Sequence, residues 1–375
     1  MVVHVLPGLT RCRASPGAFP IAKEGDAGEP RRPSLGRRRR ALEWVDRLGW
    51  RERVRSIHDR GRASLLVLAY HRILPVEDLD AYPLDPELIS ATPDEFAWQM
   101  EELARHREPV SLERVVDCFD AGGALPERAV AVTFDDGSAD LYEHAYPVLR
   151  RLGVPATIFA TTGYVDSGAP FWFELAALLM RQLPVGALTL TEHDRPLPGG
   201  DSLDARRTSL RLLHRLMKQM ADDRRSIVVA DWTRRFGDVI AGSAGALLKP
   251  LDWDQIRDMS AGGVDFGAHT VTHPNLTQLG DAELEWELRR SKEALESRLG
   301  RPIRTLAYPI GTRAAFDARV IDAARATGFR LAVTYVAGVN WMPMTDRFQL
   351  ARQGVELGTS RRLFRMLLDV PTWVR

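Results

Sequence analysis

The chain lacks the long apolar run that a membrane span requires, and it is poor in cysteine. The longest apolar candidate, residues 171–180, is too short to cross a bilayer and contains Glu174. The two cysteines, Cys12 and Cys118, lie far apart without metal-ligand or redox spacing, which excludes a disulfide framework. A formal net charge of +1 over 375 residues excludes a whole-chain attraction to nucleic acid. Any partner must therefore bind at a local site.

The N-terminus lacks a recognisable export signal. Residues 1–10 are apolar, but they carry no early positive charge and are interrupted by His4 and Pro7. Residues 11–40 are rich in proline, glycine and arginine. We interpret residues 1–40 as a disordered leader, because the alternative, a basic arm for anionic lipid or nucleic acid, lacks interleaved aromatic residues. These features predict a cytoplasmic protein with no transmembrane span and no nucleic-acid partner.

Strand-like apolar runs alternate with amphipathic helical stretches from residue 64 onward. This pattern predicts a mostly parallel sheet with helices outside it, and the length permits one α/β barrel over residues 41–375. Strands are expected at 64–70, 130–134, 155–161, 263–269, 304–309 and 329–335. Helices are expected at 41–48, 95–106, 143–153, 281–299 and 314–327, and a helical insert at about 166–250.

Polar residues fall where several of these strands end. His71 follows the strand at 64–70, Asp135 and Asp136 follow the strand at 130–134, and His269 closes the strand at 263–269. The carboxyl ends of parallel barrel strands share one face, and barrel enzymes place their active sites there. We therefore expect these side chains to form one cluster.

The segment HTVTH holds two histidines, His269 and His273, at a spacing of four. On a turn or short helix this spacing puts both side chains on one face, where they can bind one metal ion. Alternatively, they are surface residues or make polar contacts within a helix. An aspartate from another strand end would add an anionic ligand and leave a position for water. Such a set suits Zn²⁺ or a similar divalent ion in hydrolysis.

The segment AVTFDDG ends an apolar strand on two adjacent carboxylates, Asp135 and Asp136. A metal ion can neutralise one of them while the other stays free as a base. Gly137 permits the tight turn that would direct both side chains inward. Alternatively, both aspartates cap a helix that begins near Ser138.

TFDDG and HTVTH, in this order, resemble the first two motifs of the polysaccharide deacetylase family, also called the NodB-homology domain or carbohydrate esterase family 4. The resemblance covers roughly residues 64–355. It implies a distorted (β/α)₇ barrel and a metal-dependent N-deacetylase. It also implies that Asp135 is the general base and that a divalent ion, expected to be Zn²⁺, is bound by Asp136, His269 and His273.

The segment AYPIG at 307–311 resembles a degenerate third motif of the family. The resemblance implies that Tyr308 and Pro309 line the groove and that the backbone N–H of Ile310 binds the oxyanion. Many family members have an arginine two residues before this proline, where this chain has Ala307. Arg304 is nearby but cannot be placed in that role, so the partner of Asp135 is left open.

No histidine follows His273, although the family's usual last motif supplies a histidine as general acid. The segment LAYHRI instead places His71 before TFDDG, which resembles a circularly permuted branch that includes deacetylases of poly-N-acetylglucosamine. The resemblance implies that His71 is the general acid. Alternatively, His71 is a hydrogen-bonded histidine in the barrel mouth.

The expected function is metal-dependent removal of N-acetyl groups from polysaccharides or oligosaccharides that contain N-acetylhexosamine, including lipid-linked forms. Two alternatives stay open: a non-sugar amidase of the same fold, and an inactive glycan-binding protein. Phe171, Trp172 and Phe173 could stack on a sugar, but an aromatic cluster at the start of a helix favours a core position.

Overall fold

A computed structural model describes residues 63–190, 197, 200–242, 245–343 and 346–369. The predicted leader at 1–40 and the predicted helix at 41–48 lie outside these residues. Among the helices in the described part of the chain, none combines the length and apolar character needed to cross a bilayer.

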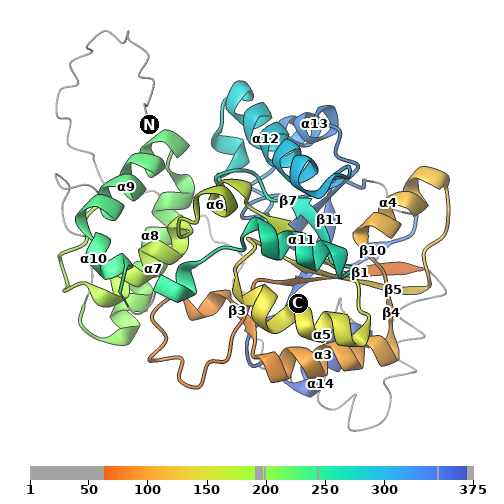
Figure 1. Cartoon of the computed structure of the whole chain (residues 1–375), viewed down its shortest axis with the longest axis horizontal. Helices are drawn as coiled ribbons and strands as arrows, with labels where there is room; N and C mark the ends of the chain where they lie inside the picture. The colour runs from red at the N-terminus through yellow and green to blue at the C-terminus, as the bar shows by residue number, and fades with distance from the viewer. Residues whose placement is uncertain (1–62, 191–196, 198–199, 243–244, 344–345, 370–375) are drawn as a thin grey trace, which may run out of the picture.

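Seven parallel strands close into a barrel (Figure 1). Around the barrel the order is β1 (Ser64–Tyr70), β5 (Arg128–Phe134), β6 (Ala156–Ala160), β7 (Asp265–Ala268), β8 (Thr305–Ala307), β9 (Leu331–Ala337) and β11 (Leu350–Gly354). Parallel pairing of β1 with both β11 and β5 closes the ring. The predicted distorted (β/α)₇ barrel is therefore confirmed.

Four short strands flank the barrel. They are β2 (Arg72–Ile73), β3 (Ile89–Ala91), β4 (Glu108–Pro109) and β10 (Asn340–Trp341). β4 pairs with β5 and β10 pairs with β1, whereas β2 and β3 form a separate two-stranded sheet beyond the end of β1.

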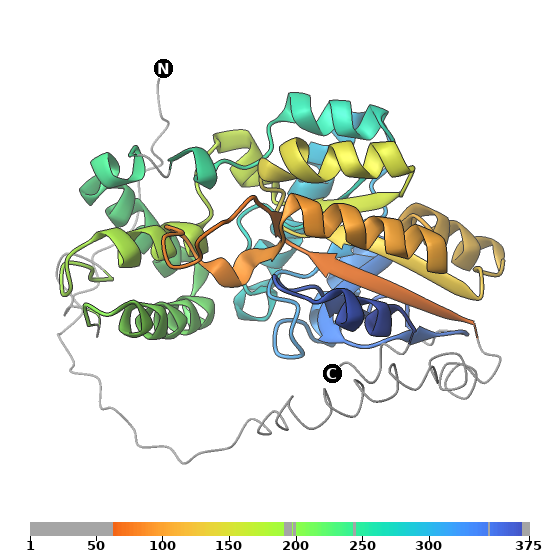
Figure 2. The same ribbon diagram turned by 90° about the horizontal axis from the view of Figure 1, so that it is seen from below.

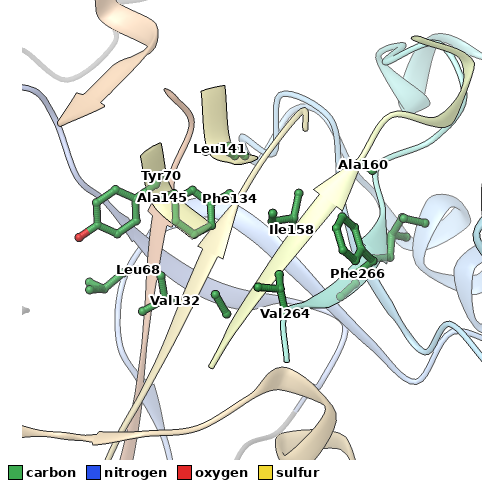
Figure 3. Packing of buried hydrophobic residues seen from close by; sticks show 14 of the residues in the cluster. Leu68, Tyr70, Val132, Phe134, Leu141, Ala145, Ile158, Ala160, Val264 and Phe266 are labelled. Atoms are coloured by element: carbon green, nitrogen blue, oxygen red, sulfur yellow. The ribbon is translucent and has the colours of Figure 1, made fainter. Parts of the chain in front are cut away.

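Most of the barrel strands are largely apolar because both of their faces are covered. All seven residues of β1 are buried. Figure 3 shows side chains from three adjacent strands, Leu68, Val132 and Ile158 among them, in one apolar cluster. This rigid core holds the strand ends in place.

Most of the helices surround the barrel. They are α3 (Pro93–His106), α4 (Leu112–Ala121), α5 (Tyr146–Leu152), α6 (Thr162–Ser167), α11 (Trp253–Ala261), α12 (Asp281–Leu299), α13 (Ala318–Ala326) and α14 (Arg361–Asp369). Helix α3 begins with a capping box in which Thr92 and Glu95 bond each other's backbone N–H groups. The single-turn helices are η1 (Pro86–Leu88), η2 (Leu141–Ala145), η3 (Gly245–Leu248) and η4 (Leu276–Gln278).

A further group of helices lies between β6 and β7 and stands to one side of the barrel (Figures 1 and 2). It contains α7 (Trp172–Gln182), α8 (Leu203–Gln219), α9 (Asp222–Arg235) and α10 (Gly237–Ile240). These helices have their own apolar cluster, which includes Trp172, Met217 and Trp232. Phe171, Trp172 and Phe173 are all buried, as the core interpretation predicts.

Candidate active site

Strand register brings His71 and Asp135 together. β1 and β5 pair with Tyr70 opposite Phe134, so the next residue of each strand leaves the barrel at the same level. The backbone N–H of Asp135 donates to the carbonyl oxygen of Tyr70 at 3.0 Å. Two residues 64 positions apart in the sequence thereby become neighbours.

The same mechanism places His269. β6 and β7 pair with Ala160 opposite Ala268, and the backbone N–H of His269 donates to the Ala160 carbonyl oxygen at 3.1 Å. The tight turn after Asp135 is closed by a bond of 2.8 Å from the Gly137 N–H to the Asp135 carbonyl oxygen. Gly137 has a φ of 85°, which explains why glycine suits this position.

Asp136, His269 and His273 form a buried group whose ligand atoms converge. Oδ1 of Asp136 lies 3.6 Å from Nε2 of His269 and 3.4 Å from Nε2 of His273. One ligand atom from each residue lies within 4.8 Å of the other two. This donor set is suited to a divalent metal ion with an open coordination position.

A hydrogen bond orients His269 for this task, and burial prepares both histidines. Nδ1 of His269 donates to the Ala307 carbonyl oxygen at 2.8 Å, which leaves Nε2 with its lone pair facing Asp136. Burial lowers the pKa of His269. Burial and the charge of His269 lower the pKa of His273 well below its ordinary value. Both imidazoles are therefore neutral near pH 7, the form that binds metal.

The backbone around this group has an uncommon conformation. Asp136, Thr270 and His273 have φ angles of 70°, 65° and 58°. Positive φ in residues other than glycine costs free energy and persists only where surrounding contacts enforce it. The Thr270 hydroxyl accepts a bond of 3.1 Å from the backbone N–H of His273, so the HTVTH loop is braced from within.

Glu287 on α12 braces the same loop from outside. One carboxylate oxygen accepts the backbone N–H groups of Val271 and Thr272 at 2.6 and 3.1 Å. The other accepts the Thr272 hydroxyl at 2.6 Å. Glu287 could not be identified from the sequence, because a single glutamate in a charged helix gives no signal of its own.

Asp135 is held by Arg352 on β11. Nη1 and Nη2 of Arg352 donate to the two oxygens of Asp135 at 2.7 and 2.6 Å. Further bonds to the carbonyl oxygen of Thr334 and the hydroxyl of Thr133 fix the guanidinium plane. Arg352 is therefore the partner of Asp135 that could not be identified from the sequence.

Arg304, the arginine that lies near the third motif in the sequence, binds helix α4 rather than Asp135. Its Nε donates to Glu113 at 2.6 Å and its Nη1 donates to Asp117 at 2.7 Å, both on α4. The available signal in the sequence was the position of Arg352 as a charged residue inside the short run LARQG at 350–354. The run is too polar to be recognised as a barrel strand from sequence.

The two adjacent aspartates have opposite electrostatic environments. Burial alone would raise the pKa of Asp135, but the charge and hydrogen bonds of Arg352 outweigh it and hold that pKa well below its usual range. Burial and the charge of Asp135 raise the pKa of Asp136 well above its ordinary value. Asp136 is therefore the carboxylate that gains most from a bound cation.

His71 lies beside this pair. Its ring centroid is 5.5 Å from that of Tyr335, and its backbone N–H donates to the Ser90 hydroxyl at 2.9 Å. Burial lowers the pKa of His71 to about 4, although the charge of Asp135 opposes the shift. His71 is therefore neutral at pH 7 in the free protein.

The third-motif residues follow β8. The Tyr308 side chain is buried and stacks on Phe316 with centroids 5.1 Å apart, so it faces the core. Ile310 has a φ of 65°, and the N–H of Gly311 donates to the Pro309 carbonyl oxygen at 2.6 Å. This tight turn directly follows Ala307, whose carbonyl oxygen holds His269.

Comparison with known proteins agrees with this geometry. The family model for polysaccharide deacetylase matches residues 122–332, more than half of the chain. The match includes both aspartates and both histidines of the site, whereas His71 and Arg352 lie outside it.

Two curated relatives are poly-beta-1,6-N-acetyl-D-glucosamine N-deacetylases from staphylococci. The protein from Staphylococcus epidermidis is 29% identical over 110 residues, which are 28% of this chain and 38% of that protein. The protein from Staphylococcus aureus strain MSSA476 is 30% identical over 108 residues, or 27% of this chain and 37% of that protein. The matched segments thus span well under half of either relative.

Solved structures extend the likeness of fold over most of the chain. The Streptococcus pyogenes deacetylase PplD in complex with acetate has a TM-score of 0.55 at 19% identity, covering 82% of this chain and 99% of that one. IcaB from Ammonifex degensii has a TM-score of 0.51 at 21% identity, covering 83% and 97%. With the family match and the arrangement of TFDDG and HTVTH on one barrel face, these findings show that the chain belongs to the polysaccharide deacetylase family.

Proposed function

We propose that the protein is a metal-dependent hydrolase that removes N-acetyl groups from glycans containing N-acetylhexosamine. One observation carries this proposal: an ionised carboxylate, Asp135, lies next to three converging metal-ligand side chains at one barrel face. Amide hydrolysis needs an activated water, a stabilised oxyanion and a protonated leaving nitrogen. The site offers a residue for each task.

Asp136, His269 and His273 would hold the metal ion. When bound, a divalent ion such as Zn²⁺ polarises a carbonyl group and lowers the pKa of water. The imidazoles are neutral and His269 is oriented by Ala307, so both histidines are in the form that binds such an ion. Asp136, whose pKa is raised in the free protein, would be held in its ionised form by the bound cation.

Asp135 would accept the proton of the attacking water. Arg352 keeps this carboxylate ionised at neutral pH and fixes its orientation with two bonds. A carboxylate of low pKa binds a proton weakly, so it can pass that proton on. His71 is neutral at the start, so it must gain a proton during the reaction before it can act as general acid. The proposed source is the neighbouring Asp135, which would pass on the proton that it took from water.

The backbone N–H of Ile310 is the proposed donor to the oxyanion. The turn closed by the bond from the Gly311 N–H to the Pro309 carbonyl oxygen fixes the backbone at Ile310. The preceding strand residue Ala307 binds His269, which holds this turn next to the proposed metal ligands. A fixed N–H group at this point would stabilise charge that develops only in the transition state.

The proposed substrate class is a polymer or oligomer of N-acetylglucosamine, including β-1,6-linked and lipid-linked forms. The names of the staphylococcal relatives support the β-1,6-linked polymer. A cytoplasmic location stays a prediction, which fractionation of cells expressing the native protein would check.

Acetate release tests the proposal. Zn²⁺-loaded wild type should release acetate from N-acetylglucosamine oligomers of β-1,4 and β-1,6 linkage, and Asp135→Asn at equal metal content should lose this activity. Release by wild type that persists in the variant would remove Asp135 from its proposed role. Metal binding without release from any sugar would favour a non-sugar amide substrate, and inactivity towards all amides would favour a glycan-binding protein.

A further inference from the structure

Arg72, the residue after His71, is a charged side chain in the interior of the protein. Only 3% of its surface is exposed. Nε of Arg72 donates to Oδ1 of Asp140 at 3.0 Å, and Nη1 donates to Oε1 of Glu174 at 2.6 Å. Nη1 also donates to the Tyr82 hydroxyl at 3.2 Å. A buried arginine with several charged partners fixes the elements that carry them relative to one another.

Asp140 connects the chain after β1 with the chain after β5. It lies four residues after Asp136, at the start of η2, and it is buried. Its second oxygen, Oδ2, accepts the backbone N–H of Ile73 at 2.9 Å. One carboxylate therefore binds both residues that follow His71: Arg72 through its side chain and Ile73 through its backbone.

The backbone of His71 is thus held from both sides. On the side of β1, the N–H of Asp135 donates to the carbonyl oxygen of Tyr70 at 3.0 Å. The N–H of His71 itself donates to the Ser90 hydroxyl at 2.9 Å. On the other side, Asp140 holds the next two residues. Because Asp135 and Asp140 belong to the same connection between β5 and η2, they set the position of His71 relative to the proposed base.

The chain that returns from the helical insert braces this anchor. The N–H of Ala139 donates to the carbonyl oxygen of Lys249 at 3.0 Å. Nη2 of Arg72 donates to the carbonyl oxygen of Leu247 at 2.8 Å. The residue before Asp140 and the side chain that Asp140 binds are therefore attached to the same short segment, so the anchor is not an isolated loop.

We propose that Asp140 and Arg72 are positioning residues for His71, which hold its imidazole where it can take a proton from Asp135 and give it to the leaving nitrogen. The inference rests on the proposed deacetylase function, in which His71 is the general acid. Both residues act through the position of His71 and not on the substrate. A displacement of about 1 Å at a reacting group lowers a rate about 100-fold, so even a small shift of His71 should be visible in kcat.

Asp140→Asn tests this role. Asparagine has one acceptor oxygen, so its NH₂ group would face one of the two donors, Arg72 or Ile73. Arg72 keeps Glu174 as a buried counter-ion, so this variant should fold, whereas removal of Arg72 would leave two buried carboxylates without a cation. With N-acetylglucosamine oligomers and at equal metal content, kcat should fall about 10- to 100-fold, with little change in KM.

Glu102→Gln is the matched control. The side chains of Glu102 and Asp140 are each 4% exposed, and Glu102 pairs with Arg365 on α14. This variant should lose stability but keep its kcat. A double-mutant cycle separates position from general damage: in the His71→Gln protein, Asp140→Asn should lower kcat no further. A wild-type kcat in Asp140→Asn, an equal fall in Glu102→Gln, or a full effect in the His71→Gln protein overturns the proposal.

The two proposals fail in different ways, because the position of His71 can also be followed without turnover. In protein with isotope-labelled histidine, the NMR signal that disappears in His71→Gln belongs to His71. Asp140→Asn should shift this signal, and Glu102→Gln should not. If wild type releases acetate but neither kcat nor the signal responds to Asp140→Asn, the deacetylase function stands and the positioning role falls. If no oligomer is deacetylated but the signal shifts in Asp140→Asn alone, the positioning role stands and the deacetylase function falls.

Discussion

Arg352 on β11 binds both carboxylate oxygens of Asp135, the residue that follows β5, at 2.7 and 2.6 Å. Both side chains are almost completely buried, with 1% and 4% of their side-chain surface exposed. A buried, bidentate ion pair of this kind has a fixed geometry, because no water competes for either partner. It orients the carboxylate at the point where the proposed reaction takes place.

Arg352→Met should destabilise the protein by about 3–5 kcal/mol, because it leaves the Asp135 carboxylate buried without a partner. Chemical denaturation measures this loss. Arg347→Met is the control: it breaks the partly exposed pair with Asp120 and should cost less than about 1 kcal/mol. Similar losses for both variants would contradict the importance of the buried pair.

Arg352→Lys should keep the charge but lose the bidentate pairing with Asp135. Because Asp135 would then be misoriented, kcat should fall about 100-fold. It should also change the pH profile. Burial raises the pKa of Asp135 once Arg352 opposes it less, so activity should disappear at a higher pH than in wild type as the pH falls. An unchanged kcat and an unchanged acidic limb would show that Arg352 does not orient the base.

Asp136→Asn should weaken metal binding by at least about 100-fold, since removing even an outer hydrogen-bond partner of a metal ligand costs about 10- to 100-fold. Metal content after dialysis measures the effect. Added Zn²⁺ should raise the Tm of wild type and of Asp135→Asn, but not that of Asp136→Asn. Full metal content in Asp136→Asn would exclude this residue as a ligand.

Glu287→Gln should lower metal affinity about tenfold without touching any ligand. The amide oxygen can accept some of the bonds from Val271 and Thr272, but the neutral side chain cannot replace both carboxylate oxygens. Glu285→Gln on the same helix is the control, because Glu285 is exposed and pairs with Arg289 at 3.7 Å. Equal metal affinity in both variants would mean that the loop keeps its shape without Glu287.

His71→Gln should lower kcat by about 100- to 10,000-fold, the usual contribution of a general acid, and should leave the metal content unchanged. His144→Gln is a suitable control because His144 lies outside the site, 3.9 Å from Glu143. A variant with wild-type kcat would support the alternative in which His71 is only a residue of the barrel mouth.

His71 also predicts a dependence of stability on pH. Its pKa is about 4 in the folded protein and near its ordinary value of 6.5 in the unfolded chain, so between these values the unfolded chain binds more protons. The free energy of unfolding should therefore fall as the pH drops from about 6.5 towards 4. His71→Gln should show a smaller decrease over this range in denaturation curves, and an identical slope would contradict the low pKa.

Much of the fold followed from local patterns. Apolar runs such as 64–70 and 130–134 became β1 and β5, and the stretch at 281–299 became α12 with the predicted bounds. Barrel strands that are covered on both faces need such apolar runs, so the order of these runs along the chain predicts the architecture. β11 escaped prediction because its arginine and glutamine are polar although both are buried, and Arg352 is compensated by Asp135 rather than by apolar packing.

The sequence by itself determined which chemistry is available, since TFDDG, HTVTH and LAYHRI each place reactive side chains at the end of a strand-like run. Only the tertiary structure decided which of these groups meet and which partner each one has. Arg352 binds Asp135 from 217 residues away in the sequence, and Glu287 approaches the HTVTH loop from a helix whose own pattern does not point to it. Local patterns arise from neighbours within a few residues, whereas these contacts depend on strand register and helix packing around the whole barrel.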